Sequence, residues 1–168
     1  MASSATALTI LMMGVGASAA IDLRTRRVPN ALTLTLATVG VASAGLGLGG
    51  ISLRASFIGM VMGLALMLPG YLFGATGAGD VKLFAAIGTV LGPSDTLTAF
   101  WYTAIAGGIL ALYVAHRRRR LAATVRDTTE LITSGGGNAT EIESAQRDNR
   151  FAYAPAIAAG SMLAALGW

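Results

Sequence analysis

The chain contains no cysteine and only one histidine, His116. The lack of cysteine excludes disulfide bonds, thiolate metal sites and a cysteine nucleophile. A single histidine gives no good basis for a serine–histidine triad. Charge is also scarce, at 12% of 168 residues, whereas soluble domains average about 25%. The remainder is 54% hydrophobic with 22 glycines, and this composition indicates an integral membrane protein.

The apolar residues occur in six blocks, which predict an all-α polytopic membrane protein with about six transmembrane helices. A bilayer core needs about 20 helical residues, with a tolerated range of about 17–25. The second, third and fifth blocks satisfy this length, the first and last are at its short edge, and the fourth is too short to span unaided. The blocks are Ala5–Ile21, Ala31–Gly49, Ala55–Gly74, Val81–Gly92, Thr96–Ala115 and Phe151–Gly167.

The distribution of lysine and arginine predicts the orientation, because cytoplasmic loops carry the excess of these residues. If all six blocks cross and both termini lie outside, eleven of the twelve basic residues face the cytoplasm and only Arg54 faces out. If the fourth block were re-entrant, the loop that carries Arg117–Arg120 would lie outside. We therefore expect the fourth block to cross the membrane.

Two hydrophilic features have alternative interpretations. The first block ends in ASAA, which resembles a signal-peptidase site, but it lacks a basic n-region, so an uncleaved helix is expected. The stretch 116–150 is expected to be a cytoplasmic loop within one membrane-embedded domain covering 1–168, with an interfacial helix as the alternative for its first part. Its arginine run is expected to contact anionic membrane lipid, and no nucleic-acid partner is expected.

Only two acidic residues lie next to the predicted membrane segments at the cytoplasmic face, Asp22 and Asp80. Five others lie in the 116–150 loop, and Asp95 lies in the predicted external turn LGPSD as a cap or turn residue. Asp22 closes the first block and Asp80 opens the fourth, so the two can meet at one membrane depth. Ionisable groups at this depth are costly and therefore indicate function.

Two neighbouring carboxylates cannot both ionise easily, so one can act as a base while the other stays protonated. This pair can activate water against a peptide carbonyl without a metal ion, cofactor or covalent intermediate. The glycines of Gly77-Ala78-Gly79-Asp80 allow unusual backbone angles and close approach of an extended substrate. The alternatives are a capping role for Asp80, paired with Lys82, and a counter-charge role for Asp22 beside the following arginines.

Three stretches of the sequence, two of which contain Asp22 and Asp80, can be compared with the motifs of known families. They are IDLRTRRVPNALTL (Ile21–Leu34), GATGAGDVKLFAAIG (Gly74–Gly88) and AYAPAIAAG (Ala152–Gly160). The second contains G-x-G-D-x-K-L, and the third has an aromatic-x-Pro block at the start of the last predicted helix. In order, spacing and predicted topology the chain resembles the type IV prepilin peptidases, which are GxGD-type membrane aspartic proteases.

The resemblance implies that Asp22 and Asp80 are the catalytic pair. The residues that it implies shape the site are Gly77, Gly79, Lys82, Pro29, Asn30 and Pro155. Lys82 would tune charge or hold the loop, and Pro29 with Asn30 would fix the turn into the second helix. An ordinary helix start for Pro29-Asn30 and a first-turn proline or kink at Pro155 are the structural alternatives.

The chain departs from larger members of this family, which carry a cytoplasmic domain with Cys-x-x-Cys pairs and an N-methyltransferase activity. The short form resembles the peptidases of tight-adherence (Flp-type) pilus systems, so methylation of the product is not implied. Archaeal preflagellin peptidases are similar in size, but the Val-Pro-Asn block fits the bacterial pilus group better. Presenilin-like proteases share G-x-G-D but place a tyrosine where this chain has Ile21.

We therefore expect a multi-pass endopeptidase of the bacterial inner membrane. Its expected substrate is a type IV pilin-like precursor, whose leader peptide it cuts at the cytoplasmic face. The alternative is a non-catalytic pilus-assembly scaffold or a small proton- or ion-coupled transporter, because membrane aspartates near a glycine break also bind protons or cations.

Overall fold

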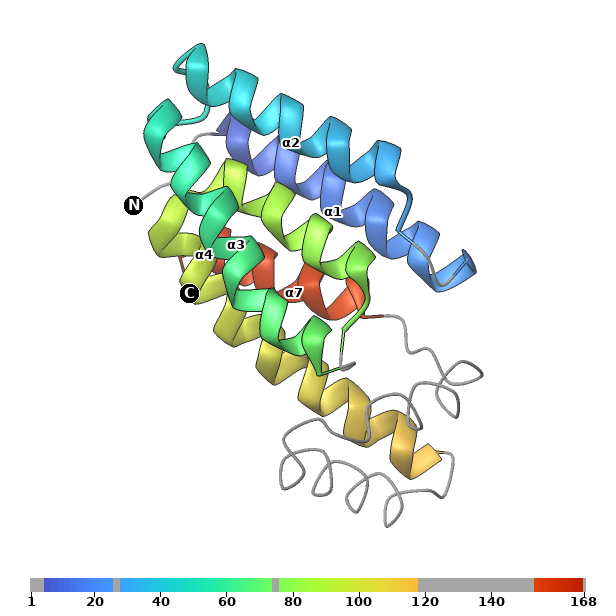
Figure 1. Cartoon of the computed structure of the whole chain (residues 1–168). Helices are drawn as coiled ribbons and strands as arrows, with labels where there is room; N and C mark the ends of the chain where they lie inside the picture. Colours follow the sequence, from blue (N-terminus) through green and yellow to red (C-terminus); the bar gives the residue numbers. More distant parts are fainter. Residues whose placement is uncertain (1–4, 26–27, 74–75, 118–152, 168) are drawn as a thin grey trace.

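The structure is a computed structural model that describes residues 5–25, 28–73, 76–117 and 153–167, with only the backbone of 114–117. These residues form the helices α1 (Ala5–Thr25), α2 (Asn30–Gly45), α3 (Leu53–Leu72), α4 (Ala78–Arg117) and α7 (Ala154–Ala165), and the described part contains no strand (Figure 1). The all-α prediction is therefore confirmed. The predicted loop 116–150 lies almost entirely outside the described residues.

Helix α4 contains both the fourth and the fifth predicted segments. They join at Gly92, whose φ of 73° and ψ of 178° break the helical path, and Pro93 follows directly. Thr96 Oγ1 donates a hydrogen bond to the Gly92 carbonyl oxygen at 2.5 Å, and Ser94 Oγ donates to Asp95 Oδ1 at 3.0 Å. The predicted external turn is thus a one-residue kink, and Asp95 lies in the first turn after it.

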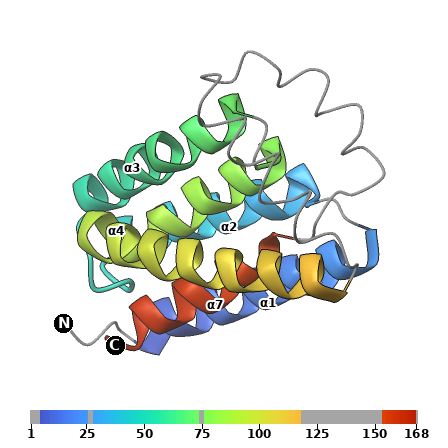
Figure 2. The ribbon, with the colours of Figure 1, turned by 90° about the horizontal axis from the view of Figure 1, so that it is seen from below.

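The first half of α4 is the centre of the bundle. Apart from Lys82, every residue from Val81 to Gly92 is buried, so this half is apolar on all sides. Helix α4 contacts α1, α2, α3 and α7, and Figure 2 shows these helices around it. A helix that is hydrophobic all round is a core helix, which explains why this short segment is so apolar.

Small residues let α3 and the first half of α4 approach at backbone distance. A Cβ added to Gly59 would collide with the Gly88 carbonyl oxygen, and a Cβ added to Gly88 would collide with that of Gly59. Beside this crossing, Ser56 Oγ donates a buried hydrogen bond to the Thr89 carbonyl oxygen at 2.7 Å. Close glycine crossings and interhelical hydroxyl bonds are typical of helix packing in membranes.

Three helical segments are long and apolar enough to cross a membrane: Ala5–Thr25, Leu53–Leu72 and Ala78–Tyr113. Helices α2 and α7 are apolar but shorter. Large hydrophobic side chains are exposed along α3 and the second half of α4, where lipid would cover them. Examples are Phe57, Val61, Leu64, Trp101, Ile105 and Ile109. The chain is thus a helical membrane protein, while the six crossings and their direction stay predictions.

Several predicted boundaries differ from the observed helices. Helix α1 continues past Ile21 to Thr25. Arg24 lies in its last turn, where a positive charge stabilises the helix by its interaction with the negative end of the helix dipole. Helix α2 ends at Gly45 rather than Gly49, because Gly47 adopts a φ of 70° and its N–H bonds the Ala44 carbonyl oxygen. Helix α7 spans only Ala154–Ala165, which is shorter than the predicted 151–167.

Candidate functional site

The three sequence blocks that carry the resemblance meet at one end of the bundle. At this end α1 finishes, and α2, α4 and α7 begin (Figure 1). Two contacts between side chains and distant parts of the chain connect them: Asp22 binds the start of α7, and Lys82 binds the start of α2. The predicted residues therefore share one region, although they lie up to about 130 positions apart in sequence.

Asp22 lies in the last turn of α1, and its residue surface is only 5% exposed. Its Oδ2 accepts a hydrogen bond from the Ala154 backbone N–H at 3.1 Å. Ala154 is the first residue of α7, whose N-cap residue Tyr153 offers no side-chain cap. Asp22 therefore supplies the missing acceptor at this helix start, where a negative charge is also favoured by the helix dipole.

Asp80 lies in the first turn of α4 and is partly buried. Its Oδ2 accepts from the Gly77 N–H at 3.1 Å, while its own N–H donates to the Gly77 carbonyl oxygen at 3.0 Å. This reciprocal pair is a helix capping arrangement, so the capping role considered from the sequence is present. The capping bond uses one carboxylate oxygen, and a cap can also carry chemistry.

Of the two glycines beside Asp80, only Gly77 has a neighbour too close for an easily accommodated Cβ. Neither Gly77 nor Gly79 adopts a positive φ, so the expectation of unusual backbone angles is wrong. A Cβ on Gly79 would lie 3.4 Å from Val28 Cβ, and one on Gly77 would lie 3.2 Å from Asp80 Oδ2. The atoms nearest to these two glycines therefore belong to Val28, which leads into α2, and to Asp80 itself.

Lys82 connects the second block to the first. Its Nζ donates a hydrogen bond to Asn30 Oδ1 at 3.1 Å, from the first turns of α4 to the first residue of α2. Pro29 is the N-cap residue of α2, and its carbonyl oxygen accepts from the Leu32 N–H at 3.1 Å. Pro29 and Asn30 thus lie at the start of α2, while their role in shaping the site stays a prediction, and Asn30 also binds Lys82.

Residues 153–155 carry the third block into the site. Pro155 is the second residue of α7, so the first-turn position expected from the sequence is confirmed. Burial, and secondly the negative charge of Asp80, raise the pKa of the Tyr153 phenol. The next residue, Ala154, binds Asp22, so the start of α7 is held against the end of α1.

Sequence reasoning did not select Tyr153 as a site residue. The aromatic position before Ala-Pro was noted only as part of the third block. Its neighbour across the bundle was also missed: the Tyr153 ring lies against the backbone of Gly107 in α4, since a Cβ there would be 2.6 Å from Tyr153 Cε2. A tyrosine directly before an apolar helix with a proline in its first turn was the available signal.

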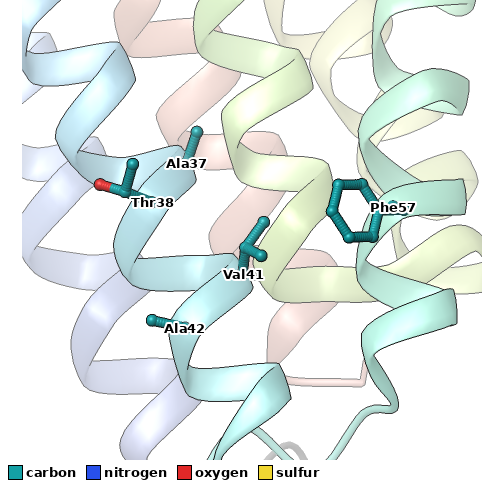
Figure 3. Close-up of a pocket in the computed structure, with 5 residues that line it drawn as sticks. All are labelled: Ala37, Thr38, Val41, Ala42 and Phe57. Carbon is teal, nitrogen blue, oxygen red and sulfur yellow. The ribbon is translucent and has the colours of Figure 1, made fainter.

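A separate apolar pocket of about 310 Å³ lies between α2 and α3 (Figure 3). It is lined by Ala37, Thr38, Val41, Ala42 and Phe57. These residues belong to the second half of α2 and the start of α3, away from the aspartates. Among the residues that the structure describes, no three histidine, aspartate or glutamate side chains are grouped to hold a metal ion.

One comparison with known proteins gave a match that includes these residues. The family model described as the type IV leader peptidase family matches residues 9–112, which is more than half of the 168-residue chain. The match includes the blocks around Asp22 and Asp80, while the block at 152–160 lies beyond it. A search of curated proteins and a search of solved structures found no match.

Proposed function

Because the chain belongs to the type IV leader peptidase family, we propose that it is an aspartic endopeptidase in which Asp22 and Asp80 activate water. The proposed substrate is a type IV pilin-like precursor, a membrane helix preceded by a charged leader. Cleavage would take place at the cytoplasmic face of the bacterial inner membrane. The family membership supports a leader-peptidase type of protease, and the residues below support the more specific assignment.

One observation carries the assignment of the two aspartates. They lie far apart in sequence and on different helices, yet Asp22 lies in the last turn of α1 and Asp80 in the first turn of α4, at the same end of the bundle, where Asp22 binds the Ala154 N–H at the start of α7. These are the only two acidic residues at this end among the side chains that the structure describes. Paired carboxylates of this kind are the groups that aspartic peptide hydrolysis requires.

The proposed reaction needs only the two carboxyl groups and water. The ionised carboxylate takes a proton from water, and the water oxygen bonds to the scissile carbonyl carbon. The protonated carboxyl group polarises that carbonyl, and a proton passes to the leaving amine as the C–N bond breaks. The roles of acid and base belong to the pair, because strongly coupled groups titrate together.

The surroundings suit this chemistry. Asp22 is buried in the bundle, so its interactions are less screened than at an aqueous surface. Asp80 lies at a helix start that packs against Val28 through Gly79 and is joined to the first residue of α2 by the Lys82–Asn30 bond. Such fixed first turns keep a carboxylate in a defined orientation, which water-activating chemistry depends on.

The test is co-expression with a prepilin-like precursor, followed by measurement of the product's mass and new N-terminus. We expect a single cut between the charged leader and the hydrophobic helix. A precursor that stays intact, in membranes where the protein accumulates, would contradict the proposal and favour a scaffold. Proton or cation flux that depends on one aspartate alone would favour a transporter.

A further inference from the structure

The segment that leads into α4 is attached to the end of α3 through Thr76. The Thr76 backbone N–H donates to the Gly70 carbonyl oxygen at 3.1 Å. The Thr76 side chain lies against the same residue, because a Cβ on Gly70 would be 3.2 Å from Thr76 Oγ1 and 3.3 Å from Cγ2. Backbone and side chain therefore both hold Thr76 on Gly70, and a long side chain at position 70 would need the space that Thr76 occupies.

Gly70 lies on the face of α3 that packs on α4. Gly59 and Gly63 approach the α4 backbone on this face, and Gly70 follows Gly63 by about two helical turns. At Gly70 the neighbour is no longer α4 itself but Thr76, shortly before α4 begins. The contact of Thr76 thus continues the tight packing between α3 and α4.

The residue after Thr76 holds Asp80. The Gly77 N–H donates to Asp80 Oδ2 at 3.1 Å, and the Gly77 carbonyl oxygen accepts from the N–H groups of Asp80 and Val81 at 3.0 and 3.2 Å. Each link from Gly70 to the Asp80 carboxylate is therefore a hydrogen bond, apart from the peptide bond that joins Thr76 to Gly77.

We propose that Thr76 is a positioning residue of the peptidase site: packed on Gly70, it fixes Gly77 and thereby the orientation of the Asp80 carboxylate. The assignment rests on the proposed function of Asp80. It gives the end of α3 a role in the reaction beyond its packing on α4.

The contact uses the shape of the threonine rather than its hydroxyl group. Thr76 Oγ1 is buried and has no hydrogen-bond partner in the part of the chain that the structure describes. A side chain branched at Cβ is stiff about χ1, which suits a residue that anchors a turn. Valine has this branched shape without the hydroxyl, and serine has the hydroxyl without the branch, so the two replacements separate shape from hydrogen bonding.

The first experiment measures kcat and KM for a prepilin-like precursor at matched membrane levels. Thr76→Gly removes the side chain, and Gly70→Leu fills the space that it occupies. We expect both to lower kcat by about tenfold or more and to change KM by less than about twofold, because a displacement of about 1 Å at a reacting group costs about 100-fold in rate. Thr76→Val should keep the native kcat, and Thr76→Ser should lie between Thr76→Val and Thr76→Gly.

The matched control is Gly108→Leu. A Cβ on Gly108 would meet nothing within 4 Å, so the same replacement there adds a leucine without displacing a neighbour. We expect this variant to cleave at the native rate. An equal loss of kcat in Gly108→Leu and Gly70→Leu would show that the contact with Thr76 is not the cause, and the proposal would be wrong.

Amide hydrogen exchange tests the anchor without a substrate. The N–H groups of Gly77 and Asp80 are bonded across one turn, so they should exchange about tenfold faster or more in Thr76→Gly and Gly70→Leu, and at the native rate in Thr76→Val. The amides of 83–91, in the buried centre, should keep their native exchange. Faster exchange there as well would show a general loss of packing and contradict the proposal.

The two measurements together decide the outcome. A native kcat in Thr76→Gly would overturn the proposal, whatever the exchange shows. A loss of activity in Thr76→Val that Thr76→Ser does not share would also overturn it, because the hydroxyl would then be the acting group. If the native protein cleaves no precursor while exchange at Gly77 and Asp80 still responds to both variants, the peptidase assignment fails and the anchor stands.

Discussion

Glycine-to-alanine substitutions at the crossing of α3 with α4 should lower the free energy of unfolding by an amount that follows from the geometry of the crossing. In Gly59→Ala or Gly88→Ala, the new methyl group would meet the backbone carbonyl oxygen of the other glycine. A backbone carbonyl in a helix cannot rotate away as a side chain can. The two helices would therefore have to separate along the buried centre of the bundle.

The expected cost has two parts. At the neighbouring position Gly63, a Cβ would lie 2.7 Å from the Phe84 carbonyl oxygen, whereas ordinary carbon–oxygen contacts are about 3.3–3.6 Å. Overpacking of this kind costs about 1–3 kcal/mol. Separation would also weaken the Ser56–Thr89 hydrogen bond, and such bonds contribute about 0.6 kcal/mol in membrane bundles. Each variant should lose about 2–4 kcal/mol of unfolding free energy.

The assay is unfolding by titration with a denaturing detergent, and Gly16→Ala is the control because a Cβ there meets nothing within 4 Å. We expect the control to unfold at or above the native midpoint, since alanine favours helix over glycine by about 1 kcal/mol. The double variant Gly59→Ala/Gly88→Ala should lose much less than the sum of the single losses, because one separation of the helices accommodates both methyl groups. Single variants as stable as Gly16→Ala, or strictly additive losses, would refute the reasoning.

Two further predictions concern the start and the middle of α4. Lys82→Met and Asn30→Ala should each lower the cleavage rate by about two- to tenfold, because each removes the hydrogen bond between these two residues. The double variant should cleave no more slowly than the slower single variant, because the two changes remove the same bond. Additive losses in a cleavage assay would contradict the shared bond. Gly92→Ala should cost about 1–2 kcal/mol of unfolding free energy from its φ of 73° alone, since no atom lies closer than 3.6 Å to the added Cβ. A variant as stable as the native protein in the same detergent titration would show that this kink relaxes without strain.

Much of the fold could be predicted from the sequence because it depends on local composition. Apolar blocks predict helices, whereas the shortness of Val81–Gly92 raised only the question whether this segment crosses the membrane and did not indicate that it is the buried centre. The structure explains this segment: it is a core helix joined to the next through a kink at Gly92, and its first turn carries Asp80. The prediction that Asp80 opens this helix is confirmed, while Asp22 lies inside α1 rather than after it.

The contacts between helices could not be predicted, because they depend on which faces meet. Nothing in the sequence pairs Lys82 with Asn30, or Tyr153 with Gly107. The spacing of Gly59 and Gly63, four residues apart on one helix face, was a usable signal for close helix packing, but it does not name Gly88 as the partner. The identities of Asp22 and Asp80 as catalytic residues also stay a prediction that only activity can test.

The most direct measurement is the rate at which the purified protein cleaves a prepilin-like precursor, compared among Asp22→Asn, Asp80→Asn and Asp95→Asn. Asp95 is the matched control, because it lies beside the Gly92 kink at the opposite end of the bundle. We expect Asp22→Asn and Asp80→Asn each to lose at least about 1,000-fold in rate, and Asp95→Asn to keep the native rate. Native-rate cleavage by either of the first two variants would show that its aspartate does not activate water, and the paired-carboxylate account would be wrong.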